Sequence, residues 1–373
     1  MTRPVYISDT NCITPLGFDT DENIRNIEAG KSGIAQITND WMPSPYFSAV
    51  IDDAAINERF SAISGDHYTK LEKLLIMALN PIVGQFPPRT DATLILSTTK
   101  GNITALADHN VKNAELSLLA RRVSEFFGIR STPIVISNAC VSGVLAIATA
   151  KRIIQAGICN DAYVVSGDLV SEFVLSGFNS FQAMSEAPCK PYSANRTGVN
   201  LGEAAAAVYV TANPDRAKVQ IIGDGAINDA NHISGPSRTG EGLVRSITAA
   251  MREAGIKAAQ IDYISAHGTA TPFNDEMEAI ALNRLGLQGV PVNSLKGYYG
   301  HTLGASGLLE TVIAIESMNR NRLYASIGFD EIGVSQPIHV ISQHTSQPIA
   351  IALKTASGFG GCNTAVLLQK VIS

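Results

Sequence analysis

Residues 134–143 are Ile134-Val135-Ile136-Ser137-Asn138-Ala139-Cys140-Val141-Ser142-Gly143, a β-branched run that ends in a small polar loop and a cysteine. An apolar, alanine-rich segment follows and ends at Gly157, a suitable C-terminal helix cap. The pattern predicts a buried strand, a sharp turn and a buried helix that begins at Cys140. A thiol at a helix N-terminus faces the positive end of the helix dipole, so we expect Cys140 to be a nucleophilic thiolate. The alternative is that Cys140 only fills the core, as most free cysteines do.

Length and composition indicate a compact protein with a large core. The chain has 373 residues, of which 45 % are hydrophobic and 16 % are charged. A net charge of −5 without a dense Lys/Arg run excludes a nucleic-acid footprint. No apolar run reaches the ~18 residues of a membrane-spanning helix, so we expect no membrane insertion. The N-terminus leads directly into a strand without a secretory pattern, and the five cysteines lack metal-type spacing. We therefore predict a cytoplasmic protein with reduced thiols.

The order of strand and helix patterns restarts after Asn213-Pro214. Each half contains a strand, a loop and a helix rich in small residues, and each ends with a glycine-rich loop before an apolar strand. Buried strands that alternate with helices predict α/β layers with largely parallel sheets. The repetition predicts a duplicated architecture whose sheets sandwich helices. We assign residues 1–212 to an N-terminal half with Cys140 and residues 213–373 to a C-terminal half with two further candidate residues.

Those two candidates are His267 and His301, which each follow a strand pattern and lie beside glycine. Loops at the carboxyl ends of strands form the sites of α/β proteins, and glycine there lets backbone approach a ligand. Thr269 and Thr271 add hydroxyls that could bind a polar group. A thiol and two imidazoles suit acyl transfer, with one nucleophile and two groups that handle protons or stabilise an oxyanion. A zinc site is less favoured because the three residues include no closely spaced ligand pair, and either histidine alone could be structural.

Two further features accompany these residues. Glu310 lies in the buried-looking run Leu308-Leu309-Glu310-Thr311-Val312-Ile313. A buried carboxylate needs a cationic partner, and Lys296 is the candidate. The loop Gly358-Phe359-Gly360-Gly361 offers backbone N–H groups for an oxyanion hole and an apolar wall. The alternative for this loop is a plain tight turn.

Taken together, these motifs resemble the β-ketoacyl-[acyl carrier protein] synthases of the elongating type, within the thiolase-like superfamily. The resemblance rests on the Ala139-Cys140 turn, the segment from His267 to Thr271, the segment from Lys296 to Gly307, and Gly358-Phe359-Gly360-Gly361, in that family's order. The stretches 98–101 and 191–203 are similar as well. The resemblance implies the thiolase-like duplicated α-β-α-β-α layered fold.

The resemblance also implies a role for each residue. Cys140 would accept the acyl group, and His267 and His301 would promote malonyl decarboxylation and stabilise the enolate. Lys296 would hold the His301 region electrostatically, with Glu310 in the supporting network. The backbone N–H groups of Cys140 and Phe359 would form the oxyanion hole, and Phe359 would gate the acyl pocket. No metal or redox cofactor is implied.

The implied reaction is a ping-pong condensation in fatty acid or specialised polyketide or polyene synthesis. Its implied partners are acyl- and malonyl-loaded acyl carrier protein and a second subunit, in a homodimer or in a heterodimer with a related synthase. One alternative is a non-condensing or chain-length-determining subunit, although such subunits usually lack the nucleophile. A second alternative is a thiolase-like priming acyltransferase, against which the second histidine, His301, argues.

Overall fold

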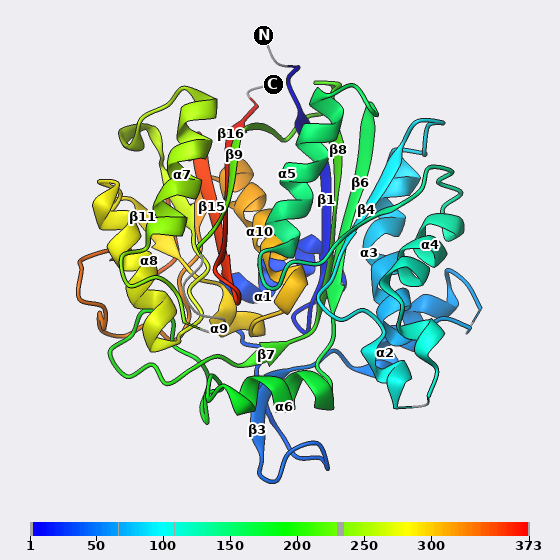
Figure 1. Cartoon of the computed structure of the whole chain (residues 1–373), viewed down its shortest axis with the longest axis horizontal. Coiled ribbons are helices and arrows are strands. Elements are labelled where there is room, and N and C mark those ends of the chain that lie inside the picture. The colour runs from blue at the N-terminus through cyan, green and yellow to red at the C-terminus, as the bar shows by residue number, and fades with distance from the viewer. Residues whose placement is uncertain (1–2, 66, 108, 230–234, 372–373) are drawn as a thin grey trace.

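The computed structural model describes residues 3–65, 67–107, 109–229 and 235–371. Across these residues runs one large mixed sheet (Figure 1). Its strands, in sheet order, are β13 (His339–Val340), β11 (Pro291–Asn293), β10 (Tyr263–Ser265), β15 (Ile351–Gly358), β16 (Cys362–Lys370), β9 (Val219–Asn228), β1 (Tyr6–Ile13), β8 (Ala204–Thr211), β6 (Asp161–Asp168), β4 (Thr93–Ser97) and β5 (Ile134–Ile136).

The two halves of this sheet repeat the same strand order and directions. From the centre outward, β1, β8 and β6 pair antiparallel, and β6, β4 and β5 pair parallel. In the other half β9, β16 and β15 pair antiparallel, and β15, β10 and β11 pair parallel. The halves meet where Tyr6 and Ile7 of β1 pair with Gln220 and Val219 of β9. The duplicated α/β fold is therefore confirmed, whereas the exact division into residues 1–212 and 213–373 stays a prediction.

The expectation of largely parallel sheets was wrong, because antiparallel pairs occupy the centre of each half. The reason is clearest at β15 and β16, which are joined by the short turn between Gly358 and Cys362. A connection this short can only join antiparallel neighbours, since a parallel pair needs a long crossover. The parallel pairs lie further out, where helices provide the crossovers.

Helices form a central layer that contacts both halves of the sheet, and a further layer on the outer face of each half. Helices α5 (Ser142–Gln155) and α10 (Ser306–Arg320) pack on each other and contact strands of both halves, so they form the central layer (Figure 1). Helices α3 (Lys70–Gln85) and α4 (Leu116–Phe126) cover one outer face, and α7 (Glu241–Ala254) and α8 (Pro272–Arg284) cover the other. A Cβ added to Gly143 would lie 2.4 Å from the Leu308 nitrogen. Glycine at this position thus permits the close packing of α5 on α10.

The remaining elements are short. They are helices α1 (Thr20–Glu28), α2 (Asp53–Ser61), α6 (Glu172–Ser180) and α9 (Lys296–Tyr299), the small sheet of β2 (Ala35–Ile37), β3 (Tyr46–Ala49) and β7 (Leu201–Gly202), the pair β12 (Arg322–Leu323) and β14 (Thr345–Ser346), and 3₁₀ turns at Ile103–Leu106, Val111–Ala114, Ala258–Gln260 and Leu303–Ala305.

One local expectation is corrected. Helix α5 was expected to begin at Cys140, yet it begins at Ser142. Ala139 has φ +45°, so the chain turns sharply there and Cys140 belongs to the turn. Within the described residues, no helix combines the length and apolar character that crossing a bilayer would need.

Candidate active site

Cys140 lies in the turn between β5 and α5, at the carboxyl end of a strand. Its side chain is buried, with 7 % exposure, and lines a cavity of about 440 Å³. The backbone N–H of Phe359 donates to the Cys140 sulfur. A Cβ on Gly358 would lie 3.1 Å from the Cys140 nitrogen, so the glycine-rich loop lies directly against the turn that carries Cys140. The two N–H groups predicted for the oxyanion hole, those of Cys140 and Phe359, are therefore brought together.

The protonation of Cys140 differs from the expected thiolate. Burial raises the pKa of the Cys140 thiol to about 11, although Lys296 and the Phe359 N–H act to lower it. Desolvation penalises the charged form, and here it outweighs the favourable charges around the sulfur. With this pKa, the protonated thiol is the main form of Cys140 at neutral pH.

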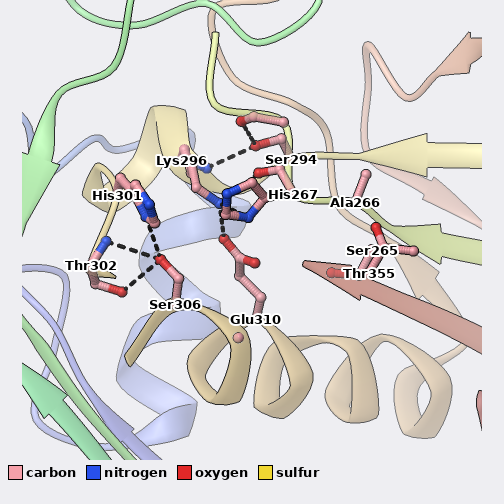
Figure 2. Close-up of polar contacts among 12 residues, drawn as sticks. Ser265, Ala266, His267, Ser294, Lys296, His301, Thr302, Ser306, Glu310 and Thr355 are labelled. Carbon is pink, nitrogen blue, oxygen red and sulfur yellow. Dashed lines mark hydrogen bonds and ion pairs between the residues drawn. The ribbon is translucent and has the colours of Figure 1, made fainter. Parts of the chain in front are cut away.

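His301 follows α9, and two backbone hydrogen bonds fix its position. Its N–H donates to the Asn200 carbonyl at 2.7 Å, and its carbonyl accepts from the Gly202 N–H at 3.0 Å. Its Nδ1 lies 2.8 Å from the hydroxyl of Ser306, which also accepts the Thr302 N–H (Figure 2). The Nε2 atom is buried and has no partner within the described residues. The side chain of His301 therefore offers a free ring nitrogen at the cavity.

His267 follows β10 and meets His301 edge to face. The ammonium of Lys296 lies 3.5 Å from Nδ1 of His267 and donates to the His267 carbonyl at 2.5 Å. An ammonium can only donate, so Nδ1 of His267 accepts and the ring proton resides on Nε2. Burial, then Lys296 and His301, hold the pKa of His267 well below its usual range. Burial and Lys296 do the same for the pKa of His301.

Lys296 and Glu310 form the ion pair that the sequence suggested, at 2.7 Å, with both side chains buried (Figure 2). The cavity brings together Cys140, His267, His301 and Phe359, and Thr269 and Thr271 also line it. The two threonine hydroxyls bond each other at 2.8 Å. The ring of Phe359 stacks on Phe178, with centroids 5.5 Å apart.

Comparison with known proteins identifies the family of this chain. Residues 84–215 match the N-terminal domain of β-ketoacyl synthases, and residues 219–330 match the C-terminal domain. A 3-oxoacyl-[acyl-carrier-protein] synthase 2 from Vibrio cholerae is 32 % identical, over 70 % of this chain and 68 % of its own length. The chain belongs to the β-ketoacyl synthase family. Its predicted class, an acyltransferase of the condensing type, is confirmed with it.

Further relatives extend the likeness over the full length. A putative mitochondrial 3-oxoacyl-[acyl-carrier-protein] synthase of Schizosaccharomyces pombe is 26 % identical, over 99 % of this chain and 100 % of its own. The structure of the ketosynthase ApeO of Xenorhabdus doucetiae, solved in complex with its chain length factor ApeC, superposes with a TM-score of 0.87. That match is 27 % identical and covers 99 % of this chain and 98 % of the other. These matches confirm the thiolase-like fold.

A zinc site, the alternative considered from the sequence, is opposed by a positive charge beside the three candidate ligands. The ligand atoms of Cys140, His267 and His301 all lie within 4.8 Å of one another. The Lys296 ammonium, however, occupies the space next to the His267 ring. A fixed positive charge at that place opposes a dication and favours an anion instead.

Sequence reasoning missed buried charged residues near the site, among them Glu278 and Lys354. Glu278, in α8, accepts the backbone N–H groups of His267 and Gly268 at 2.8 and 2.6 Å. Lys354, in β15, forms a second ion pair with Glu310 at 2.6 Å. A lysine inside the apolar run of a central strand was the available signal, because a buried ammonium requires a partner. Its partner lies on α10, which the linear sequence does not place beside β15.

Proposed function

We propose that this chain is a β-ketoacyl-[acyl carrier protein] synthase that uses Cys140 as its nucleophile. The Cys140 sulfur attacks the thioester carbonyl of an acyl-carrier protein. The bond between the acyl carbon and the carrier sulfur breaks, and the carrier thiol leaves with the proton that Cys140 loses. The N–H groups of Cys140 and Phe359 stabilise the tetrahedral oxyanion.

The second half-reaction is a decarboxylative condensation. Malonyl-carrier protein loses CO₂, and the electron pair of the broken bond becomes an enolate. The enolate carbon then attacks the acyl carbonyl on Cys140, which forms the new C–C bond and releases the Cys140 thiolate. His267 and His301 donate from Nε2 to the thioester oxygen where the enolate charge develops.

One observation supports this proposal above the others. A thiol and two imidazoles converge on one cavity, and buried contacts hold both rings uncharged, with Nδ1 of His267 engaged by an ammonium. Neutral imidazoles that donate from Nε2 suit an oxyanion and leave the enolate unprotonated. A chain-length-determining subunit is less well supported, because this chain retains the nucleophile and both histidines.

We also propose the partners. The curated relatives are named for acyl carrier protein, and the ketosynthase ApeO was solved with a chain length factor. In the described residues β5 is an edge strand of the large sheet, and its three residues are half-buried. An open edge can pair with another strand, so β5 is a candidate contact for a second subunit. We place the protein in the cytoplasm, where its five free cysteines would stay reduced.

The test is the intact mass of the protein after incubation with a panel of acyl-carrier proteins. We expect a gain of one acyl group, its loss in Cys140→Ala, and its discharge by malonyl-carrier protein. Cys362→Ala is the matched control, because Cys362 is a more exposed thiol outside the cavity lining. No acylation with any donor, alone or with a related subunit, would refute the proposal. Acylation without a β-ketoacyl product would limit the chain to acyl transfer.

A further inference from the structure

Lys354 is a fully buried lysine inside β15, a strand whose other residues are almost all buried. Its ammonium pairs with Glu310 Oε2 at 2.6 Å. It also donates to the carbonyl oxygens of Ser265 and Ala266 at 3.1 and 3.2 Å. A buried ammonium is costly unless it is fully compensated, and here the compensation comes from the segment that leads into His267.

Two lysines thus share one carboxylate and one backbone segment. Lys296 pairs with Glu310 Oε1 and donates to the His267 carbonyl. Together the two ammonium groups bind the carbonyls of three consecutive residues, 265 to 267 (Figure 2 shows Ser265, Ala266 and His267 in this order). We call Lys296, Lys354 and Glu310 the lysine clamp. It fixes the end of β10 at the point where the chain presents the imidazole of His267.

The charges that face His267 come from several elements. Lys296 lies at the start of α9, Lys354 on β15 and Glu310 on α10, while Glu278 of α8 binds the His267 backbone N–H. His301 and Cys140 face the ring from the cavity. Both carboxylates are engaged, Glu310 by the two lysines and Glu278 by backbone and side-chain donors. Neither carboxylate therefore pairs with the His267 ring to stabilise an imidazolium. The positive charges of the two lysines oppose protonation of the ring.

We propose that Lys354 is a positioning residue for the condensation: within the lysine clamp it fixes residues 265–267 and keeps the imidazoles of His267 and His301 uncharged. The second part rests on the proposed function, since uncharged rings matter only if they donate to an enolate. In support, Lys354 is among the groups that lower the pKa of both histidines, after burial and Lys296. Without Lys354, part of the barrier to ring protonation is removed.

The experiment deletes the charge and measures the histidines directly. Lys354→Gln keeps a donor for the carbonyls and removes the charge, and Lys354→Met is the second charge-deleting variant. NMR of the intact protein with ¹³C-labelled histidine follows ring protonation from about pH 5 to 8, the range in which free histidine titrates. His267→Asn and His301→Asn assign the two signals. We expect both signals to stay flat in the parent, and the His267 signal to begin to titrate within this range in both charge-deleting variants.

Controls separate this role from a structural one. Lys354→Arg keeps the charge and is expected to restore the flat titration. Lys151→Met removes another buried lysine, paired with Asp224 and Glu253, and should lower stability without moving either signal. The pH below which the rate of malonyl decarboxylation falls should rise together with the His267 midpoint.

The outcomes are distinct. Lost stability in Lys354→Gln or Lys354→Met with unchanged histidine titration would overturn the proposal, because Lys354 would then be structural only. Absent decarboxylation in the parent protein would refute the proposed function, while the titration would still decide the charge effect of Lys354. If the His267 titration shifts and the pH dependence of malonyl decarboxylation does not, the link between Lys354 and the condensation is overturned.

Discussion

The imidazole rings of His267 and His301 meet edge to face, with centroids 5.2 Å apart and planes at 84°. They come from the same half of the chain but from different loops, and their ring nitrogens lie near the thiol of Cys140 from the other half. Two protonated rings this close would repel each other in a buried site. The arrangement therefore favours two neutral imidazoles.

Replacement of either histidine should separate acyl transfer from condensation. We expect His267→Ala and His301→Ala to lose about 10²- to 10³-fold in malonyl decarboxylation, the usual cost of one oxyanion donor. Transfer of the acyl group to Cys140 should persist, because the oxyanion hole proposed for that step consists of backbone N–H groups. His339→Ala, an exposed histidine, is the control. Equal loss of both half-reactions would contradict this division of roles.

Alkylation of Cys140 should depend strongly on pH. Since burial raises the pKa of this thiol to about 11, the reactive thiolate is scarce at neutral pH, and its fraction rises about tenfold per pH unit up to that value. Lys296 lowers this pKa, so Lys296→Met should slow alkylation further at a given pH. Iodoacetamide labelling followed by mass spectrometry, with Cys140→Ala as the blank, measures both effects. A rate that is already at its plateau at neutral pH would contradict the prediction.

Gly202→Ala should displace His301. A Cβ at this position would lie 1.9 Å from the Tyr299 carbonyl oxygen, and the Gly202 N–H binds the His301 carbonyl. Backbone must therefore move, at a cost of about 1–3 kcal/mol in the free energy of unfolding. Gly84→Ala in α3 is the matched control, because its Cβ meets open space. We expect that control to gain up to about 1 kcal/mol in urea unfolding.

Asp168→Asn should loosen two loops next to Cys140. The buried carboxylate accepts from the hydroxyls of Thr98 and Thr99, and from the backbone N–H groups of Thr99, Lys100 and Gly304. The NH₂ group of an asparagine would face these donors and could not accept from them. We therefore expect a loss of about 1–3 kcal/mol in the free energy of unfolding. Thermal unfolding and the acylation rate of Cys140 report the effect. Asp215→Asn, at an exposed position, should change neither.

The sequence by itself determined most of the elements and the residues that meet at the cavity. Strands β4, β6 and β8 and helices α3, α7 and α10 were predictable, because apolar periodicity and caps are local signals. The same holds for Cys140, His267 and His301, whose glycine-rich loops follow strand patterns. The pairing of Lys296 with Glu310 could be suggested because a carboxylate in an apolar run needs a cation.

Only the tertiary structure decided what surrounds those residues. The antiparallel centre of the sheet, the charge state of Cys140, and the contacts of Glu278 and Lys354 depend on segments far apart in the chain. Desolvation is a property of the packed site, which is why a helix-dipole argument alone mispredicted the Cys140 thiol. Lys354 shows the same limit, since a lysine in β15 acquires its role only where β10 and α10 bring three carbonyls and Glu310 to its ammonium.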